Sequence, residues 1–199
     1  MRTLIFATSN AHKTEEVAAM LGAEWVVESM ISYPHVTLPE ETGMTFEANA
    51  IIKAQGASAA LHGKLILADD SGLEVDALNG RPGVWSARFA GESATDADNR
   101  ALLKSELSRL PPAPFGGRFR CCLALVKDGQ VLHVTHGAVE GHLRMEEQGS
   151  GGFGYDALFQ PQGYEDTFGL LTAEVKNSLS HRARAMTEMK TWLQSYSQA

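Results

Sequence analysis

Residues 65–76, LILADDSGLEVD, place two adjacent carboxylates directly after a short apolar run. The run predicts a buried strand over 65–68, with Asp69 and Asp70 delivered at its C-terminal end. Ligands of open α/β sheets bind outside such strand ends. Because consecutive side chains of a strand point to opposite faces, the two acids cannot face one pocket equally. The alternative interpretation is a turn whose acids cap a helix.

Strand and helix patterns alternate along the rest of the chain. Apolar runs predict strands over residues 2–8, 25–31, 118–127 and 130–138, with a further short one at 143–146. Apolar periodicity and capping residues predict helices over 11–21, 45–61, 95–110 and 177–196. The Asp128-Gly129 pair predicts a tight hairpin turn. This order of elements predicts an α/β fold with a mixed sheet.

Length and composition narrow the class of protein. A chain of 199 residues with 44% hydrophobic residues is expected to form one domain, or one domain in two lobes. The net charge of −7 argues against non-specific nucleic-acid binding. No apolar run reaches the roughly 20 residues of a membrane helix. Cys121 and Cys122 are neighbours on a predicted strand, so we expect two reduced thiols and a cytoplasmic protein.

The stretch ATSNAHK, residues 7–13, joins the first predicted strand to the first predicted helix. Free backbone N–H groups and the helix dipole make such a helix start suitable for an anion. Thr8, Ser9 and Asn10 add side-chain donors, and Lys13 adds a positive charge. The pattern is neither a Walker A loop nor a GxGxxG loop. The alternative is an ordinary turn capped by Asn10.

The acidic stretch LPEETGMTFEANA, residues 38–50, places Glu40 and Glu41 in a loop before a helix. Loop carboxylates suit Mg²⁺, which binds one or two of them together with water and phosphate oxygens. The alternative is a solvated acidic loop.

The glycine-rich stretch GSGGFGYD, residues 149–156, offers aromatic rings beside a flexible backbone. Glycine allows the backbone to approach a ligand closely, and Phe153 and Tyr155 provide flat faces for a base. Asp156 either accepts hydrogen bonds from the base or ribose, or braces the loop. The alternative is a flexible hairpin loop with core aromatics.

The stretch EVKNSLSHRARA, residues 174–185, carries three cationic or titratable side chains. We place Lys176, His181 and Arg182 around the first turn of the last helix, where the helix dipole disfavours positive charge. Such a placement favours binding of an anion or a carbonyl oxygen, and the alternative is solvated surface charge.

Taken together, these stretches supply what a Mg²⁺-nucleotide needs.

The motifs also resemble a known family. TSNAHK, EETGMTF, LADDSGLEVDAL, GGFGYD and VKNSLSHRARA occur in the order seen in the inosine/xanthosine triphosphate pyrophosphatase family. The resemblance implies an elongated mixed β-sheet in two lobes flanked by helices, with the active-site cleft between the lobes. It implies one such domain over residues 1–199. It further implies a homodimer that uses Mg²⁺ to hydrolyse ITP, dITP and XTP to the monophosphate and pyrophosphate, which removes deaminated purines from the nucleotide pool.

The resemblance assigns roles by motif. Asp70 would accept the proton of the attacking water and would hold Mg²⁺ together with Glu40. Substrate contacts would come from Thr8, Ser9, Asn10, Lys13, Ser71, Phe153, Gly154, Tyr155, Asp156, Lys176, His181 and Arg182. The last three would select a 6-oxo purine, because a donor aimed at O6 would be left unpaired against the amino group of adenine.

One position departs from the family pattern. The family commonly has glutamate where this chain has Ala48. With Thr45 as the N-cap, residue 48 is the third helical position, and a glutamate there would close a capping box. We therefore expect a weaker helix start or an altered metal affinity.

Three other functions stay open at this level. The first is a related pyrophosphatase that prefers other modified or canonical nucleotides. The second is a nucleotide-binding module without catalysis, which the alanine at position 48 makes conceivable. The third is a nucleic-acid-binding repair protein, which the acidic composition disfavours.

Overall fold

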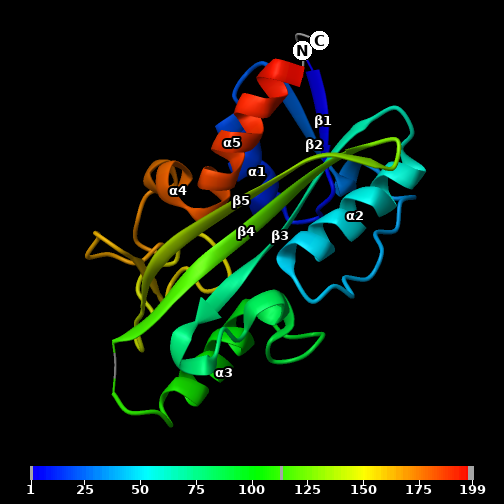
Figure 1. Cartoon of the computed structure of the whole chain (residues 1–199). Helices are drawn as coiled ribbons and strands as arrows, with labels where there is room; N and C mark the ends of the chain where they lie inside the picture. The colour runs from blue at the N-terminus through cyan, green and yellow to red at the C-terminus, as the bar shows by residue number, and fades with distance from the viewer. Residues whose placement is uncertain (1, 113, 197–199) are drawn as a thin grey trace. The chain divides into compact units, whose positions relative to one another are not determined.

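The computed structural model describes residues 2–112 and 114–196, which fall into two compact units (Figure 1). Unit 1 comprises residues up to 70, 121–137 and from 182 onward, and unit 2 comprises residues 71–120 and 138–181. The strands are β1 (Arg2–Phe6), β2 (Trp25–Ser29), β3 (Leu65–Val75), β4 (Phe115–Lys127), β5 (Gln130–Leu143) and β6 (Phe159–Pro161). The α-helices are α1 (Ala11–Leu21), α2 (Phe46–Ala60), α3 (Asp96–Leu107), α4 (Ala173–Leu179) and α5 (His181–Tyr196). Short 3-10 helices cover Met30–Ser32, Asp76–Leu78 and Gly83–Arg88.

The strands form one mixed sheet in the order β2-β1-β3-β4-β5-β6. Strand β1 runs parallel to β2 and β3, whereas β6 runs antiparallel to β5. Asp128 and Gly129, which join β4 to β5, both have positive φ, as a tight two-residue hairpin turn requires. The predicted α/β fold with a mixed sheet is therefore confirmed. The predicted cleft between two lobes stays a prediction.

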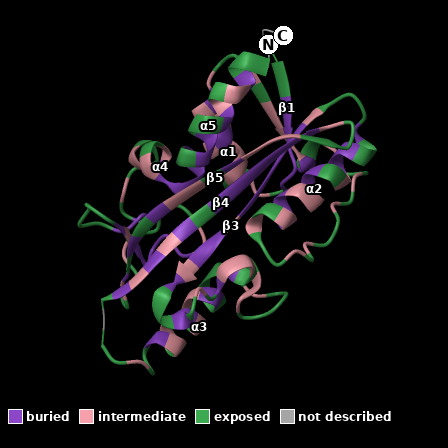
Figure 2. Cartoon of the chain, in the orientation of Figure 1, coloured by how far each residue is buried: buried purple, intermediate pink, exposed green. Residues whose placement is uncertain are grey.

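In unit 1, strand alternation sorts side chains between two cores. One core gathers Leu4 and Phe6 with residues of α1 and α5, and the other gathers Ile5 and Ala7 with residues of α2. Figure 1 shows α2 on one face of the sheet and α1 and α5 on the other. In Figure 2 the buried residues run along β1, β3 and β4. Each of these strands is thus buried on both faces, which explains their nearly continuous apolar sequence.

The two cysteines follow the same alternation. Cys121 packs in the core that contains α1 and α5, and Cys122 packs in the core that contains α2. Both thiols are free. The prediction of two reduced core cysteines is confirmed for the reason given, namely that neighbours on a strand point apart.

Unit 2 has a single apolar core of its own. It packs the buried face of α3, including Leu103 and Leu107, against strand residues such as Leu73 and Val75 and against the aromatic rings of Phe159 and Phe168. Thr95 and Asp98 form a full capping box at the start of α3. The predicted N-caps of α2 and α3 are both confirmed.

Several predicted boundaries are wrong, and three of the differences bear on the arrangement of the chain. Strand β3 does not end at residue 68 but continues through both aspartates to Val75, so the alternative of a turn with helix-capping acids is wrong. Residues 144–146 form no strand, because β5 already ends at Leu143, and β6 was not anticipated. The last helix is divided at Ser180, whose extended backbone separates α4 from α5.

The break at Ser180 has a packing reason. Leu179 packs against the core of unit 2, whereas Ala185 and Met186 are buried in the core of unit 1. The apolar stripe predicted for one helix therefore belongs to two cores. Within residues 2–112 and 114–196, no helix combines the length and apolarity needed to cross a membrane.

Candidate active site

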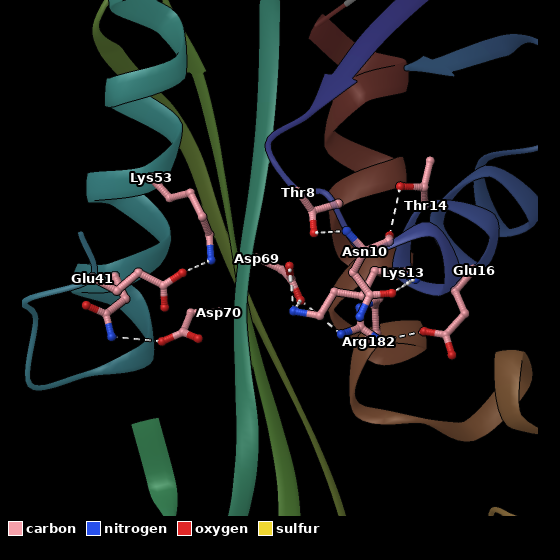
Figure 3. Close-up of polar contacts among 11 residues, drawn as sticks. Thr8, Asn10, Lys13, Thr14, Glu16, Glu41, Lys53, Asp69, Asp70 and Arg182 are labelled. Carbon is pink, nitrogen blue, oxygen red and sulfur yellow. Dashed lines mark hydrogen bonds and ion pairs between the residues drawn. The ribbon is translucent and has the colours of Figure 1, made fainter. Parts of the chain in front are cut away.

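Strand β3 directs Asp69 and Asp70 to opposite sides (Figure 3). Figure 3 shows Asp70 on the side of α2, together with Lys53 and Glu41. It shows Asp69 on the other side, together with Lys13 and Arg182. The expectation that the two acids do not share one pocket is confirmed, and it holds because the strand continues through both of them.

The carboxylate of Asp70 is held by Asn49. The Nδ2 group of Asn49 donates a hydrogen bond of 3.0 Å to Oδ2 of Asp70, and its Oδ1 accepts one of 2.7 Å from the backbone N–H of Gly43. The two bonds together fix which way the amide of Asn49 faces. A Cβ atom on Gly43 would lie 2.6 Å from Oδ1 of Asn49, so this loop position needs a residue without a side chain. Asn49 is a positioning residue that the sequence did not reveal.

Burial raises the pKa of Asp70 to about 6. The hydrogen bond from Asn49 and the charge of Lys53 act in the opposite direction, and the negative charge of Glu41 raises the pKa further. Asp70 as a whole residue is only 6% exposed. An aspartate in this state is ionised at neutral pH and yet more basic than an exposed one, which suits a general base.

Lys53 is a second residue that the sequence did not reveal. Its ammonium group, almost fully buried, forms an ion pair with Glu41. Although burial lowers the pKa of Lys53, the charges of Asp69 and Glu41 outweigh that effect and raise it overall, so the side chain stays charged. The run AIIKA hid this lysine in an ordinary helix pattern. The sequence feature that could have indicated this residue is a lysine between apolar neighbours on a helix that packs against the sheet.

Glu40, the predicted metal ligand, lies exposed in the loop before α2. Its neighbour Glu41 is the carboxylate whose charge acts on Asp70. Both glutamates are carried by the same loop, as predicted. Of the two, Glu41 has the stronger structural connection to Asp70 and Lys53.

Asp69 belongs to a buried ionic network. The ammonium of Lys13 lies 3.0 Å from Oδ2 of Asp69, and Nη2 of Arg182 lies 2.9 Å from the same oxygen. Arg182 also pairs with Glu16. Burial alone would raise the pKa of Asp69, but the charges of Lys13, Arg182 and Lys53 hold it well below its usual range. Asp69 therefore stays ionised and holds Lys13 in place at the start of α1.

The predicted anion site at residues 8–13 is built as a capped helix start. Asn10 is the N-cap of α1, and its side chain accepts a hydrogen bond of 3.2 Å from the backbone N–H of Lys13. The hydroxyl of buried Thr8 accepts a hydrogen bond from the N–H of Asn10, and Ser9 is exposed. The alternative of a turn capped by Asn10 is thus correct as local structure, and it is compatible with an anion at the same N-terminus.

In unit 2, Asp156 braces the glycine-rich loop. Its Oδ2 accepts hydrogen bonds from the backbone N–H of Phe153 at 2.9 Å and from the ammonium of Lys176 at 2.7 Å. That ammonium also lies 4.6 Å from the centre of the Phe153 ring. Gly152 has a φ of +71°, and a Cβ atom there would lie 2.1 Å from Oδ2 of Asp156. The loop is therefore a defined structure that presents the half-buried ring of Phe153.

Two other predicted contact residues have core roles in unit 2. The ring of Tyr155 packs in the apolar core, and its hydroxyl donates to the backbone oxygen of Ser86. His181 is buried and stacks on Phe119, with ring centres 4.9 Å apart. The flat face that we predicted for Tyr155 is therefore covered by protein. Ser71 and Gly154 are half-buried.

The three cations predicted to cluster around one helical turn are separated. Lys176 lies in α4 rather than in the first turn of the last helix, and it pairs with Asp156. His181 also belongs to unit 2, whereas Arg182 belongs to unit 1, where it binds Asp69. The predicted site residues thus form two groups. In unit 1, Lys13 and Arg182 meet at Asp69, on the side of β3 that carries Thr8 and Asn10, whereas Asp70 lies on the other side (Figure 3). In unit 2, Phe153, Asp156 and Lys176 lie together.

Comparison with known proteins gives a consistent result. The sequence model of the Ham1 family matches residues 4–192. The dITP/XTP pyrophosphatase of Desulforamulus reducens is 47% identical over 184 residues, which are 92% of this chain and 91% of that protein. The dITP/XTP pyrophosphatase of Exiguobacterium sibiricum is 44% identical over 194 residues, covering 97% and 98% of the two chains. The structure of a HAM1 protein from Coxiella burnetii matches with a TM-score of 0.85 at 36% identity, and covers 98% of this chain and 100% of that chain.

Proposed function

The chain belongs to the Ham1 family, and from this we propose that it hydrolyses dITP, ITP and XTP to the nucleoside monophosphate and pyrophosphate, with Mg²⁺ as cofactor. Two nearly full-length relatives carry the name dITP/XTP pyrophosphatase. The observation in this chain that best supports the proposal is the state of Asp70. It is a buried carboxylate with a raised pKa, held by Asn49 and facing the Lys53–Glu41 pair.

The donor set fits a divalent cation. The negative charge of Glu41 raises the pKa of Asp70, so two carboxylates repel each other at this position. Such oxygen donors are those that Mg²⁺ prefers, and a cation held by Asp70 with Glu40 or Glu41 would relieve the repulsion. When bound, Mg²⁺ supplies positive charge to the triphosphate oxygens.

The residues of the chain perform the remaining steps. Asp70 accepts the proton of the attacking water, and Asn49 keeps its carboxylate oriented. Lys13 and Lys53 stabilise negative charge on the phosphates, while the N-terminus of α1 adds backbone N–H groups. Asp69 does not act on the water. Because it binds Lys13 and Arg182, it positions the lysine.

The base is recognised by unit 2 in this proposal. Phe153 offers the face on which a purine stacks, since Tyr155 is occupied in the core. Lys176 is held beside that ring by Asp156 and supplies a donor suited to a 6-oxo group. The predicted contacts of Ser71, Gly154, His181 and Arg182 with substrate, and the homodimer, remain predictions.

A pyrophosphate-release assay tests the proposal. We expect ITP, dITP and XTP to be turned over with a higher kcat/KM than GTP, ATP or dUTP, and only in the presence of Mg²⁺. GTP as the best substrate would refute the assignment. Turnover unchanged in Asp70→Asn would show that the site described is not the one that hydrolyses the nucleotide.

A further inference from the structure

Three side chains with metal-binding atoms meet in unit 1. Glu47 comes from the first turn of α2, Cys122 from β4 and His136 from β5. Their carboxylate oxygen, thiol sulfur and imidazole nitrogen all lie within 4.8 Å of one another. Nε2 of His136 lies 3.1 Å from Oε2 of Glu47. No residue of this cluster has a part in the proposed hydrolysis.

One ligand of the cluster is buried and the other two are exposed. Cys122 is fully buried in the core beside α2. The side chains of Glu47 and His136 are 51% and 62% exposed. Two of the three ligands are therefore in contact with solvent, and the third lies in the core.

The ligand types favour zinc over magnesium. Zn²⁺ binds thiolate, imidazole and carboxylate in tetrahedral sites, often with three protein ligands and one open position. With Zn–N, Zn–O and Zn–S bonds of about 2.0 to 2.3 Å, the donor atoms of such a site lie roughly 3.3 to 3.6 Å apart. The donor atoms, all within 4.8 Å of one another, are therefore close to the spacing of such a site. Mg²⁺, in contrast, selects oxygen ligands.

We propose that Glu47, Cys122 and His136 form a binding site for Zn²⁺ or a similar transition-metal ion, separate from the carboxylates proposed to hold Mg²⁺. Binding there ties the start of α2 to β4 and β5. The tether matters because Asn49, two residues after Glu47, holds the carboxylate of Asp70.

The thiol of Cys122 must lose its proton to bind the metal, and the positive charge of the ion drives that loss.

Cobalt titration of the intact protein tests the site without reference to activity. In a metal-free sample, Co²⁺ should produce a thiolate-to-cobalt charge-transfer band that saturates at one equivalent per chain. The band should be retained in Cys121→Ser and lost in Cys122→Ser. Cys121 is the matched control, since it is equally buried on the same strand but points into the opposite core. Zn²⁺ should abolish the band at one equivalent, and excess Mg²⁺ should not.

Variants of the other two ligands distinguish a three-ligand site from metal binding by the thiol alone. We expect His136→Gln and Glu47→Gln to weaken Co²⁺ binding at least about tenfold. Both positions are exposed, so these variants should fold as the wild type does, and the unfolding temperature in EDTA checks this. Zn²⁺ should raise that temperature in the wild type and in Cys121→Ser, but not in His136→Gln. The proposal would be overturned if the wild type gave no charge-transfer band. It would also be overturned if His136→Gln and Glu47→Gln both bound Co²⁺ as tightly as the wild type.

Discussion

Asp69 and Asp70 are neighbours in the chain, yet their environments move their pKa values in opposite directions. Burial dominates at Asp70 and raises its pKa to about 6. At Asp69 burial is outweighed by the charges of Lys13, Arg182 and Lys53, which lower the pKa. Pairs of acids separated in this way take separate roles, one as base and one as structural anion.

The raised pKa of Asp70 predicts a cost in stability. Since its pKa is higher in the folded chain than in the unfolded chain, ionisation lowers stability as the pH rises from about 4 to about 6. Asp70→Asn removes that cost while keeping an acceptor for Asn49. In EDTA at pH 7.5 we expect the variant to be more stable than wild type by on the order of 1 to 3 kcal/mol, with no difference near pH 4. Turnover should fall by about 10² to 10⁴. Urea unfolding at the two pH values measures the first effect, and pyrophosphate release the second.

Asp69→Asn is the matched comparison, and the expected pattern is reversed. The substitution removes the carboxylate that Lys13 and Arg182 share and leaves Arg182 only its pair with Glu16, which costs about 3 to 5 kcal/mol of stability. The folded variant should retain more turnover than Asp70→Asn. Similar stability and activity in the two variants would contradict the division of roles between the two sides of β3.

The pKa of Asp70 also predicts the acid limb of the pH profile of kcat/KM. Because the base must be ionised, kcat/KM should fall about tenfold per pH unit below about pH 6. The residual rate of Asp70→Asn should lack this limb. A limb in the wild type that appears only near pH 4, as for an exposed aspartate, would mean that burial does not govern the base.

At the scale of elements, the start of α2 carries Ala48, where the family resemblance leads us to expect a glutamate. The hydroxyl of Thr45 accepts a hydrogen bond of 3.1 Å from the N–H of Ala48, as predicted for an N-cap. The reciprocal bond to the N–H of Thr45 needs a longer side chain at position 48. Helix α3 has both bonds, through Thr95 and Asp98.

Ala48→Glu should therefore complete the capping box of α2. We expect a gain of about 1 kcal/mol, which corresponds to a rise in Tm of about 2 to 4 °C for a chain of this size. The Mg²⁺ midpoint of turnover should shift in the same variant, because Asn49 follows directly and holds Asp70. Ala48→Leu is the control, since leucine cannot accept the hydrogen bond. No change in Tm or in Mg²⁺ dependence would refute this account of position 48.

At the scale of the whole molecule, the two units hold different sets of the residues proposed to bind substrate. Unit 1 holds the groups proposed for the triphosphate, which all nucleotides share. Unit 2 holds Phe153 and Lys176, proposed for the base, in which nucleotides differ. A substitution in unit 1 should therefore lower the rate for all nucleotides, and a substitution in unit 2 should change the selectivity between nucleotides.

Two variants test this division. Lys53→Met removes the positive charge beside Asp70 and Glu41, and we expect kcat to fall by a factor of about 10² to 10³. The factor should be similar for ITP and XTP. Phe153→Ala removes a stacking surface worth about 1 to 3 kcal/mol, so KM should rise and the ratio of kcat/KM between ITP and GTP should change. An altered ratio in Lys53→Met, or an unaltered KM in Phe153→Ala, would contradict the assignment. The assay is the nucleotide panel used for the proposed function.

The sequence by itself determined the class of fold, the free thiols, the helix caps and the Asp128-Gly129 turn. It could do so because these features depend on local periodicity and on residues a few positions apart. It also placed Asp69 and Asp70 on opposite faces, from strand alternation alone. The motifs identified the family, although not the roles of individual side chains within it.

Only the tertiary structure decided which partners those side chains have. Lys53 looks like an ordinary helical residue until α2 packs on the sheet and buries it beside Glu41. Lys176 and Arg182, which appeared to share one turn, lie on either side of Ser180 and belong to different units. Charge pairs such as Asp69 with Arg182 join residues 113 positions apart. Burial and distant charge determine a pKa, and neither can be read from neighbours in the chain.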